Sequence, residues 1–361
     1  MSKRLLIILI FTSLLIIILF INSLLVPKRE PNRSSESTII DLVRSEAITT
    51  RISGISKQKN ISIHNSEDED EDEATQFFEK FDLKIPSRDD FENLILNDEK
   101  IETMIAAGII LKEPSFFHAA LELNPNNPHV FFLLAQENSI GLEKKLAFAR
   151  NLLELQPDNL VASYLLSSVQ IELEEFDASI KTLLETDKQN LFDDFFVETA
   201  TIVKNCLLEF NNSEAGASLY SIFNMPVPMA LKYRQIAKFL SENESLSEEE
   251  SIQTRKLIAK IGTNLVNQRG LIINELVGIS IQKMAMDGMD DEDNSPFEGM
   301  NNIQAKKNLE LQKEEIRGSV TTDIFEIAEH DPETIVAWSN MILEIGEFEA
   351  NKWVKNKEGN K

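Results

Sequence analysis

The sequence predicts an all-α protein: an N-terminal transmembrane helix, a flexible tether, and then a row of α-hairpin repeats that continues into a helical C-terminal region. Three observations lead to this prediction: an apolar run at the N-terminus, apolar residues at helical spacing from Phe77 onward, and a motif that returns after 32 residues. The composition agrees, because 12 glycines and 11 prolines are too few for a turn-rich all-β chain of 361 residues.

Residues 1–4 form an N-terminal tail, and Leu5–Val26 is expected to be a transmembrane signal anchor. Its 22 residues include eighteen Leu, Ile, Phe or Val side chains. As a helix it would extend ~33 Å, enough to cross a hydrocarbon core of ~30 Å, and its insertion is favoured by roughly 7 kcal/mol. The alternative is a cleaved signal peptide, but its apolar region is usually shorter and ends at a small-x-small site, which Asn22-Ser23-Leu24-Leu25-Val26 does not supply.

The orientation of this anchor follows weakly from its flanking charges. Lys3 and Arg4 precede the run, while Lys28, Arg29 and Arg33 follow it, so the positive-inside rule is nearly balanced. A short basic head before a long apolar run favours an inside N-terminus. Because abundant Ile, Asn and Lys suggest an AT-rich bacterial genome, the predicted location is the bacterial inner membrane, with the soluble domain periplasmic.

Residues 27–74 are expected to be a disordered acidic tether. They contain no Phe, Trp or Tyr and include the unbroken acidic run Glu67–Glu73. A flexible coil of this length would place the folded domain on the order of 40 Å from the membrane. A calcium site is the alternative for the acidic run, but such a site needs oxygens at defined spacings around a turn-forming Gly, and the run offers diffuse charge.

Residues 75–235 are expected to be a helical repeat domain. Apolar periodicity and breaks at Pro, Gly and Asn predict helices over Asn97–Leu111, Pro128–Ile140, Leu142–Leu155, Leu160–Glu174 and Asp177–Thr186. Since the turns between them are short, consecutive helices should be antiparallel neighbours.

The repeated motif is Leu-Glu-Leu, then a polar amide residue, then Pro, then a polar pair that ends in Asn. It occupies residues 121–127 and returns at 153–159, and 160–190 supply a weaker third unit. In this pattern a helix ends on an apolar pair, Asn caps the next helix, and Pro stands where no backbone donor is needed. Each helix pair cannot bury its apolar face alone, so the pairs should stack.

This motif, with its flanking residues, resembles tetratricopeptide repeats. When Pro125 and Pro157 are aligned with the Pro of that family, large and small residues fall on its packing positions: Phe117, Ala120, Phe131, Ala135, Phe176 and Ser179. The resemblance covers residues 113–190, with an isolated echo near 325–353 that includes Trp338. The period of 32 instead of ~34 and the missing Tyr depart from the family pattern, which leaves an irregular helical bundle as the alternative.

The resemblance also implies a partner-binding groove on the first helices of the repeats. Carried over by alignment, the groove positions are His129, Phe132, Gln136, Val161, Tyr164 and Ser168. Ordinary packing or exposed surface is the competing interpretation of the same residues.

Three further segments complete the chain. Residues 236–286 are expected to form apolar helices that dock on the repeats or make an oligomer contact, with close packing or a break explaining Gly262, Gly270 and Gly278. Residues 287–300 are expected to be an acidic loop, and 301–361 C-terminal helices with a partial repeat. An EF-hand over 287–298 is disfavoured because Glu292 occupies the position that requires Gly.

Neither a catalytic constellation nor a cofactor or metal motif is recognisable in the sequence. The single cysteine, Cys206, excludes a disulfide within the chain, and the four histidines lack zinc-hydrolase spacing. The net charge of −24 disfavours nucleic acid as a partner.

These observations together predict a membrane-anchored, non-catalytic protein-protein interaction scaffold or assembly factor. Its partners would be proteins with basic or apolar segments, because acidic partners are repelled. Two alternatives remain: an enzyme or enzyme subunit with an unrecognised site in 236–361, and an oligomeric structural component of the cell envelope that self-associates through 247–286.

Overall fold

A computed structural model describes residues 81–189, 191–224, 229–242, 248–268, 270–319 and 331–359. The chain divides into two units, 1–82 and 83–361, and all the described helices belong to the second. The predicted anchor at 5–26 and the tether at 27–74 lie outside the described residues. Among the residues that are described, no helix combines the length and the apolar character that a membrane crossing requires.

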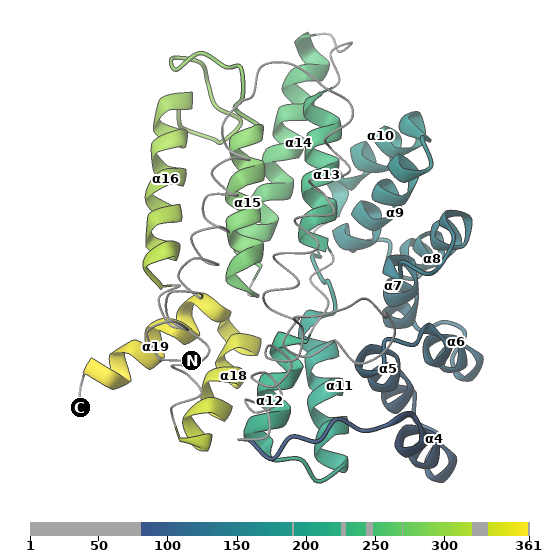
Figure 1. The fold of residues 1–361 in the computed structure, drawn as a ribbon. Coiled ribbons are helices and arrows are strands. Elements are labelled where there is room, and N and C mark those ends of the chain that lie inside the picture. The colour runs from purple at the N-terminus through teal and green to yellow at the C-terminus, as the bar shows by residue number, and fades with distance from the viewer. Residues whose placement is uncertain are drawn as a thin grey trace, which may run out of the picture. The chain divides into compact units, whose positions relative to one another are not determined.

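The first seven described helices form a row of contacting neighbours (Figure 1). They are α4 (Arg88–Asn97), α5 (Ile101–Ile110), α6 (Pro114–Leu123), α7 (Pro128–Gln136), α8 (Leu142–Leu155), α9 (Leu160–Glu172) and α10 (Phe176–Leu184). Each contacts the next through a short turn, so consecutive helices are antiparallel. A 3-10 turn, η1 (Glu185–Lys188), follows the last of them.

The repeated motif caps the helices of this row. The Asn127 side chain accepts a hydrogen bond from the backbone N–H of Val130 at 3.1 Å, and Pro128 occupies the first turn of α7. Asn159 repeats this role at the start of α9, where its side chain accepts from the N–H of Val161 at 3.1 Å. An Asn at the N-cap satisfies a backbone donor that has no partner within the helix, so the two motifs fix where α7 and α9 begin.

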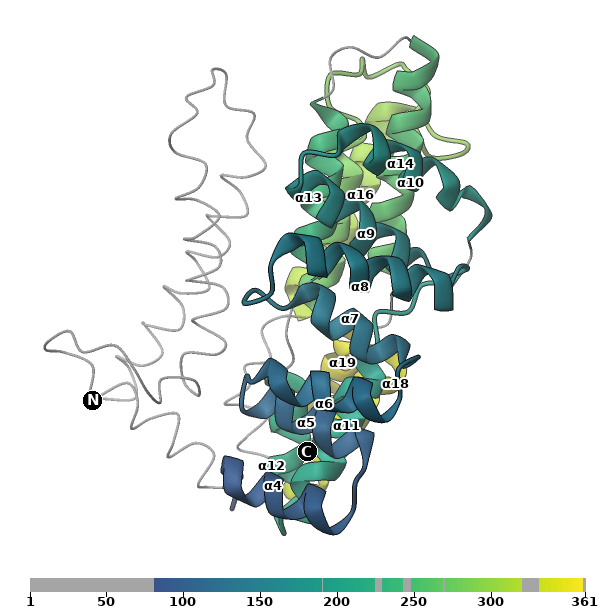
Figure 2. The ribbon, with the colours of Figure 1, turned by 90° about the vertical axis from the view of Figure 1, so that its right-hand side faces the viewer.

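The remaining helices lie behind this row and at the C-terminus. They are α11 (Phe196–Glu209), α12 (Glu214–Phe223), α13 (Met229–Ser241), α14 (Glu248–Asn267), α15 (Ile272–Met284), α16 (Asn302–Ser319), α18 (Pro332–Ile345) and α19 (Glu347–Gly359). Helix α11 packs on α5 and α13 packs on α9, so the two helices cover one side of the row. Figure 2 views the row from the other side, with α4, α6 and α8 toward the reader.

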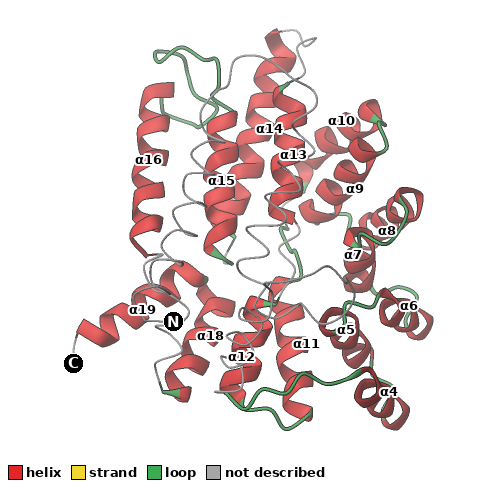
Figure 3. Ribbon diagram, in the orientation of Figure 1, coloured by secondary structure: helices red, strands yellow, loops and turns green. Residues whose placement is uncertain are grey.

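The all-α prediction is confirmed for the described residues, which contain fifteen α-helices and no strand (Figure 3). Helix α13 runs through position 235, where the sequence placed the end of the repeat domain. The apolar segment that follows forms two helices in contact, α14 and α15, and the turn between them contains Gly270. Gly262 and Gly278 lie at the contact between these two helices.

The acidic segment 287–300 joins α15 to α16 and is held at both ends. The side chain of Asn302 donates to the carbonyls of Met289 and Asp290, at 2.9 and 3.1 Å. Met289 and Phe297 pack against a core cluster that includes Ile279 of α15. Met289, at the third position of the disfavoured EF-hand pattern, therefore contributes to the core.

Candidate functional site

The groove positions expected from the tetratricopeptide resemblance lie on the side of the row that α11 and α13 cover. His129, Phe132, Val161, Tyr164 and Ser168 expose between 0% and 4% of their surface, and Gln136 is half-buried. Their surroundings belong to the same chain. The structure therefore leaves almost no surface on five of these six residues that a separate protein could contact.

His129 of α7 contacts three residues at the start of α11, namely Phe195, Glu198 and Thr199. Its Nε2 atom lies 2.7 Å from the hydroxyl of Thr199, its Nδ1 atom lies 3.2 Å from a carboxylate oxygen of Glu198, and its ring stacks on Phe195 at 5.0 Å. The Thr199 hydroxyl donates its proton to the carbonyl of Phe195 at 2.6 Å. Because that hydroxyl has only one proton, His129 must be the donor in its bond to Thr199.

A hydroxyl, an imidazole and a carboxylate are also the parts of a hydrolase triad, but Thr199, His129 and Glu198 are not arranged for that chemistry. In a triad the hydroxyl gives its proton to the imidazole and is open to substrate. Here the proton points to a backbone carbonyl, and Thr199 is only 2% exposed. The three side chains instead join α7 to α11 through polar contacts. The hydrogen bond between His129 and Glu198 lowers the pKa of the Glu198 carboxyl.

Phe132 and Gln136, the other two groove positions on α7, have local packing roles. The centre of the Phe132 ring lies 5.1 Å from that of Phe195, so this side chain packs α7 against the start of α11. The Gln136 amide donates to the backbone carbonyl of Phe132 at 3.2 Å. Phe195 itself has a φ of 58°, a left-handed value that is rare for a bulky residue. Its contacts with His129 and Phe132 hold this backbone in place.

The positions on α9 are covered by α13 and by the segment that precedes α11. The Tyr164 ring meets Tyr233 edge-on at 5.5 Å and Phe192 at 6.5 Å. The Lys232 ammonium lies 3.4 Å from the Ser168 hydroxyl and 3.1 Å from the Glu172 carboxylate. Val161 is fully buried, next to the cap formed by Asn159. No local pattern in the sequence indicated Thr199, Lys232 or Tyr233, which come from helices far along the chain.

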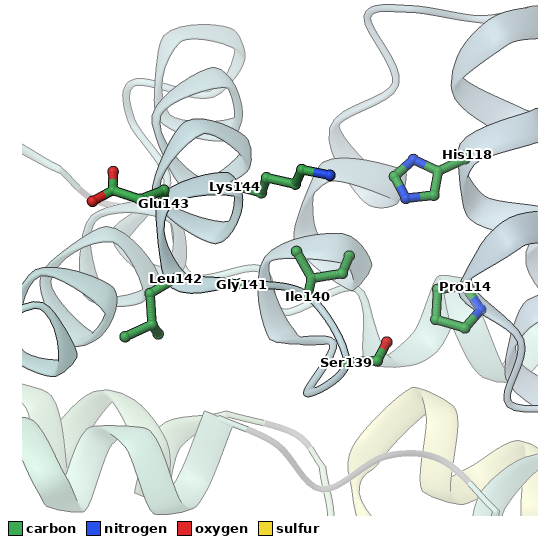
Figure 4. Close-up of a pocket in the computed structure, with 8 residues that line it drawn as sticks. All are labelled: Pro114, His118, Ser139, Ile140, Gly141, Leu142, Glu143 and Lys144. Carbon is green, nitrogen blue, oxygen red and sulfur yellow. The ribbon is translucent and has the colours of Figure 1, made fainter.

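A hollow of about 770 Å³ opens at a different place on the row, beside α6 and α8. Figure 4 shows that Lys144 points across the hollow toward His118, whereas Glu143 points away. Apolar and polar side chains share its wall, and none of them comes from α11 or α13. The lining residues are Pro114, His118, Ser139, Ile140, Gly141, Leu142, Glu143 and Lys144.

The α8 side of this hollow carries local positive charge, in a chain whose net charge is −24. It includes the first turn of α8, where the N-cap residue Gly141 supplies no side-chain hydrogen bond. Backbone N–H groups at such a helix start carry partial positive charge, which the Lys144 ammonium reinforces. Pro114, Ile140 and Leu142 add apolar wall, so the hollow has the mixed character of a protein or peptide contact site.

A second group of titratable residues lies where α15 meets α19. Burial, with the carboxylates of Glu347 and Glu349 close by, raises the pKa of Glu275 to about 7. Glu347 accepts a hydrogen bond from the backbone N–H of Ile272 at 2.9 Å, and its own N–H donates to the carbonyl of Gly270 at 2.9 Å. The Glu347 carboxylate is thus used to cap α15, so this cluster joins two helices.

Comparisons with family models, curated proteins and solved structures found no match to the chain. Within the part of the chain that the structure describes, no group of three or more His, Cys, Asp or Glu side chains is arranged to hold a metal ion.

Proposed function

We propose that the protein is a membrane-anchored, non-catalytic interaction scaffold or assembly factor whose partner docks on the uncovered side of the helix row. One observation carries the proposal: the row is supported along one side by α11 and α13 of the same chain, while the hollow beside α6 and α8 stays open. A rigid helical surface with a preformed recess is suited to holding a partner.

The repeat assignment is part of the same proposal. The even spacing of α6 to α10, the short turns and the recurrent Asn caps support tetratricopeptide-like hairpins that stack as an α-solenoid. This chain differs from a typical repeat array at the groove side of the row, because its own aromatic residues cover that side. Partner binding is therefore reassigned from His129 and Tyr164 to the hollow.

The proposed setting is the periplasmic face of a bacterial inner membrane. Leu5–Val26 would anchor the chain and 27–74 would tether it, which keeps the scaffold within reach of other membrane proteins. The net charge of −24 favours partners with basic or apolar segments over acidic ones. Deleting residues 1–26 should release the protein from the membrane fraction.

Photo-cross-linking of the full-length chain in its membrane tests the scaffold proposal. A photoreactive residue placed at His118 or Lys144 should trap one protein at high yield. The same residue placed at Lys307, exposed on α16, is the matched control and should trap none. Absence of any trapped protein at His118 and Lys144, with the chain folded, would contradict the proposal.

An enzymatic role in 236–361 is supported by one observation only, the raised pKa of Glu275 beside two carboxylates. An acid that titrates near neutrality can serve as a general acid or base. If the native protein turns over a substrate and folded Glu275→Gln does not, the enzymatic role is favoured over the scaffold.

A further inference from the structure

We propose that the C-terminal ends of α6 and α8 form an acidic, apolar docking edge for a basic amphipathic segment of a partner protein. This edge, named here the leucine edge, consists of Glu122 and Leu123 on α6 and Glu154 and Leu155 on α8. It deepens the scaffold function proposed above, because it names the chemistry of the partner.

The leucine edge repeats the same exposed side chains at the same helical position. Leu123 and Leu155 are 41% and 40% exposed, and each is the last residue of its helix. Glu122 and Glu154 directly precede them and are also exposed. Because α6 and α8 are two steps apart in an antiparallel row, they run in the same direction, so both ends point to the same side.

The charge at these two helix ends departs from the usual pattern. Helix C-termini carry partial negative charge and favour Lys or Arg in the last turn. Neither α6 nor α8 has a basic residue there, and within the described residues Glu122 and Glu154 form no ion pair. Two exposed acids placed at two negative helix ends, each beside an exposed leucine, lack an intramolecular explanation.

The chemistry that complements this edge is a helix with leucine-like residues on one face and Lys or Arg beside them. The apolar face would cover Leu123 and Leu155, while the cations would meet Glu122, Glu154 and the free carbonyls of the helix ends. A second copy of this chain fits poorly, because both copies carry a net charge of −24. Helix α10 extends the edge with exposed Leu184 and Glu185, although Lys181 lies in its last turn.

The chain contains its own sequence-matched control. The four residues Leu-Glu-Leu-Gln occur at 153–156 in the edge and again at 309–312 inside α16. Leu311 is 61% exposed there, but Glu310 is ion-paired with Lys283 and the helix continues beyond it. Replacing Leu311 therefore removes an exposed leucine that has neither a helix end nor an unpaired acid beside it.

The test measures binding of a synthetic 18-residue helix of Leu and Lys, with all leucines on one face, to the full-length protein in detergent. The double change Leu123→Ser and Leu155→Ser should weaken binding at least tenfold, and Glu122→Gln with Glu154→Gln several-fold. Leu311→Ser should change it less than twofold. Circular dichroism checks that each variant is folded.

Three results would overturn the edge. Equal binding of an isomeric peptide with its leucines spread around the helix would reduce the attraction to diffuse charge. Equal weakening by Leu311→Ser would remove the special role of the helix ends. A dimer in sedimentation that the double Leu→Ser change dissolves would assign the edge to a second copy.

Cross-linking separates this failure from failure of the scaffold function. A protein trapped at His118, together with unchanged peptide binding in the edge variants, would reject the edge and keep the scaffold. Nothing trapped at His118 or Lys144 would reject the scaffold itself, whatever the peptide does.

Discussion

Gly262 of α14 and Gly278 of α15 lie opposite each other where the two helices meet, and each leaves room for the backbone of the other. A Cβ atom added to Gly262 would lie 2.6 Å from the carbonyl oxygen of Gly278, and one added to Gly278 would lie 2.7 Å from the carbonyl oxygen of Gly262. Both distances are far shorter than a carbon–oxygen contact allows. The two helices can approach this closely only because both positions are glycine.

Replacing either glycine with alanine should lower the free energy of unfolding by about 2–3 kcal/mol, because the obstacle is backbone and the helices must move apart. Urea denaturation of the protein measures this change. Gly318→Ala is the matched control, since an added Cβ at this position of α16 meets no atom within 4 Å. It should be neutral or stabilise by about 0.5–1 kcal/mol. Equal effects at Gly262 and Gly318 would contradict the close contact.

Thr199→Val should destabilise the protein by about 2 kcal/mol, since it leaves the buried His129 donor and the Phe195 carbonyl without their shared hydroxyl. Thr201→Val is the control on the same helix: its hydroxyl bonds the Val197 carbonyl at 2.7 Å, but the site is exposed. That change should alter the free energy of unfolding by less than about 0.5 kcal/mol. If both variants unfold alike, the bond between His129 and Thr199 does not tie α7 to α11.

The sequence allowed the helices of the row to be predicted because their ends are encoded locally. The expected starts at Pro128, Leu142 and Leu160 coincide with the starts of α7, α8 and α9. Asn caps act within a few residues at α7 and α9, and α8 begins directly after Gly141. The break at Gly270 was also visible in a local pattern. Each of these features depends on neighbours in the chain.

The use of the groove side could not be predicted in the same way. The contacts that cover it join residues far apart, such as His129 with Thr199 and Ser168 with Lys232, and no local pattern encodes such pairs. Large aromatic residues at the groove positions Phe132 and Tyr164 are consistent with burial, yet the same residues are common in binding sites. The hollow also depends on how α6 and α8 are placed in space.

Glu275 should make the stability of the protein fall as the pH rises from about 4.5 to about 7. Its folded pKa of about 7 lies above its ordinary value of 4.5, so the folded state keeps a proton that the unfolded chain has released in this window. Glu275→Gln should therefore be more stable than the native protein by about 1–2 kcal/mol at pH 8, and similar to it at pH 4. Urea denaturation at the two pH values measures the difference.

Glu310→Gln provides the control of opposite sign. The hydrogen bond from Lys283 lowers the pKa of Glu310, so this carboxylate stabilises the folded state above its ordinary pKa and loses that effect as the pH falls. The variant should be less stable than the native protein at pH 8. A stabilising effect of Glu310→Gln, or none from Glu275→Gln, would contradict these assignments.

Cys206 should be almost unreactive in the folded protein. Burial, with Glu209 nearby, raises the pKa of its thiol to about 12, and only 5% of the residue is exposed. Since the thiolate is the reactive species, a thiol reagent such as Ellman's reagent should label it about 10³-fold more slowly in the native state than in guanidinium. Cys206 lies on α11, the helix that covers the groove side, so its labelling rate also reports how often that helix opens. Fast labelling without denaturant would mean that α11 leaves the row readily, and that the groove positions His129 and Phe132 become accessible to a partner after all.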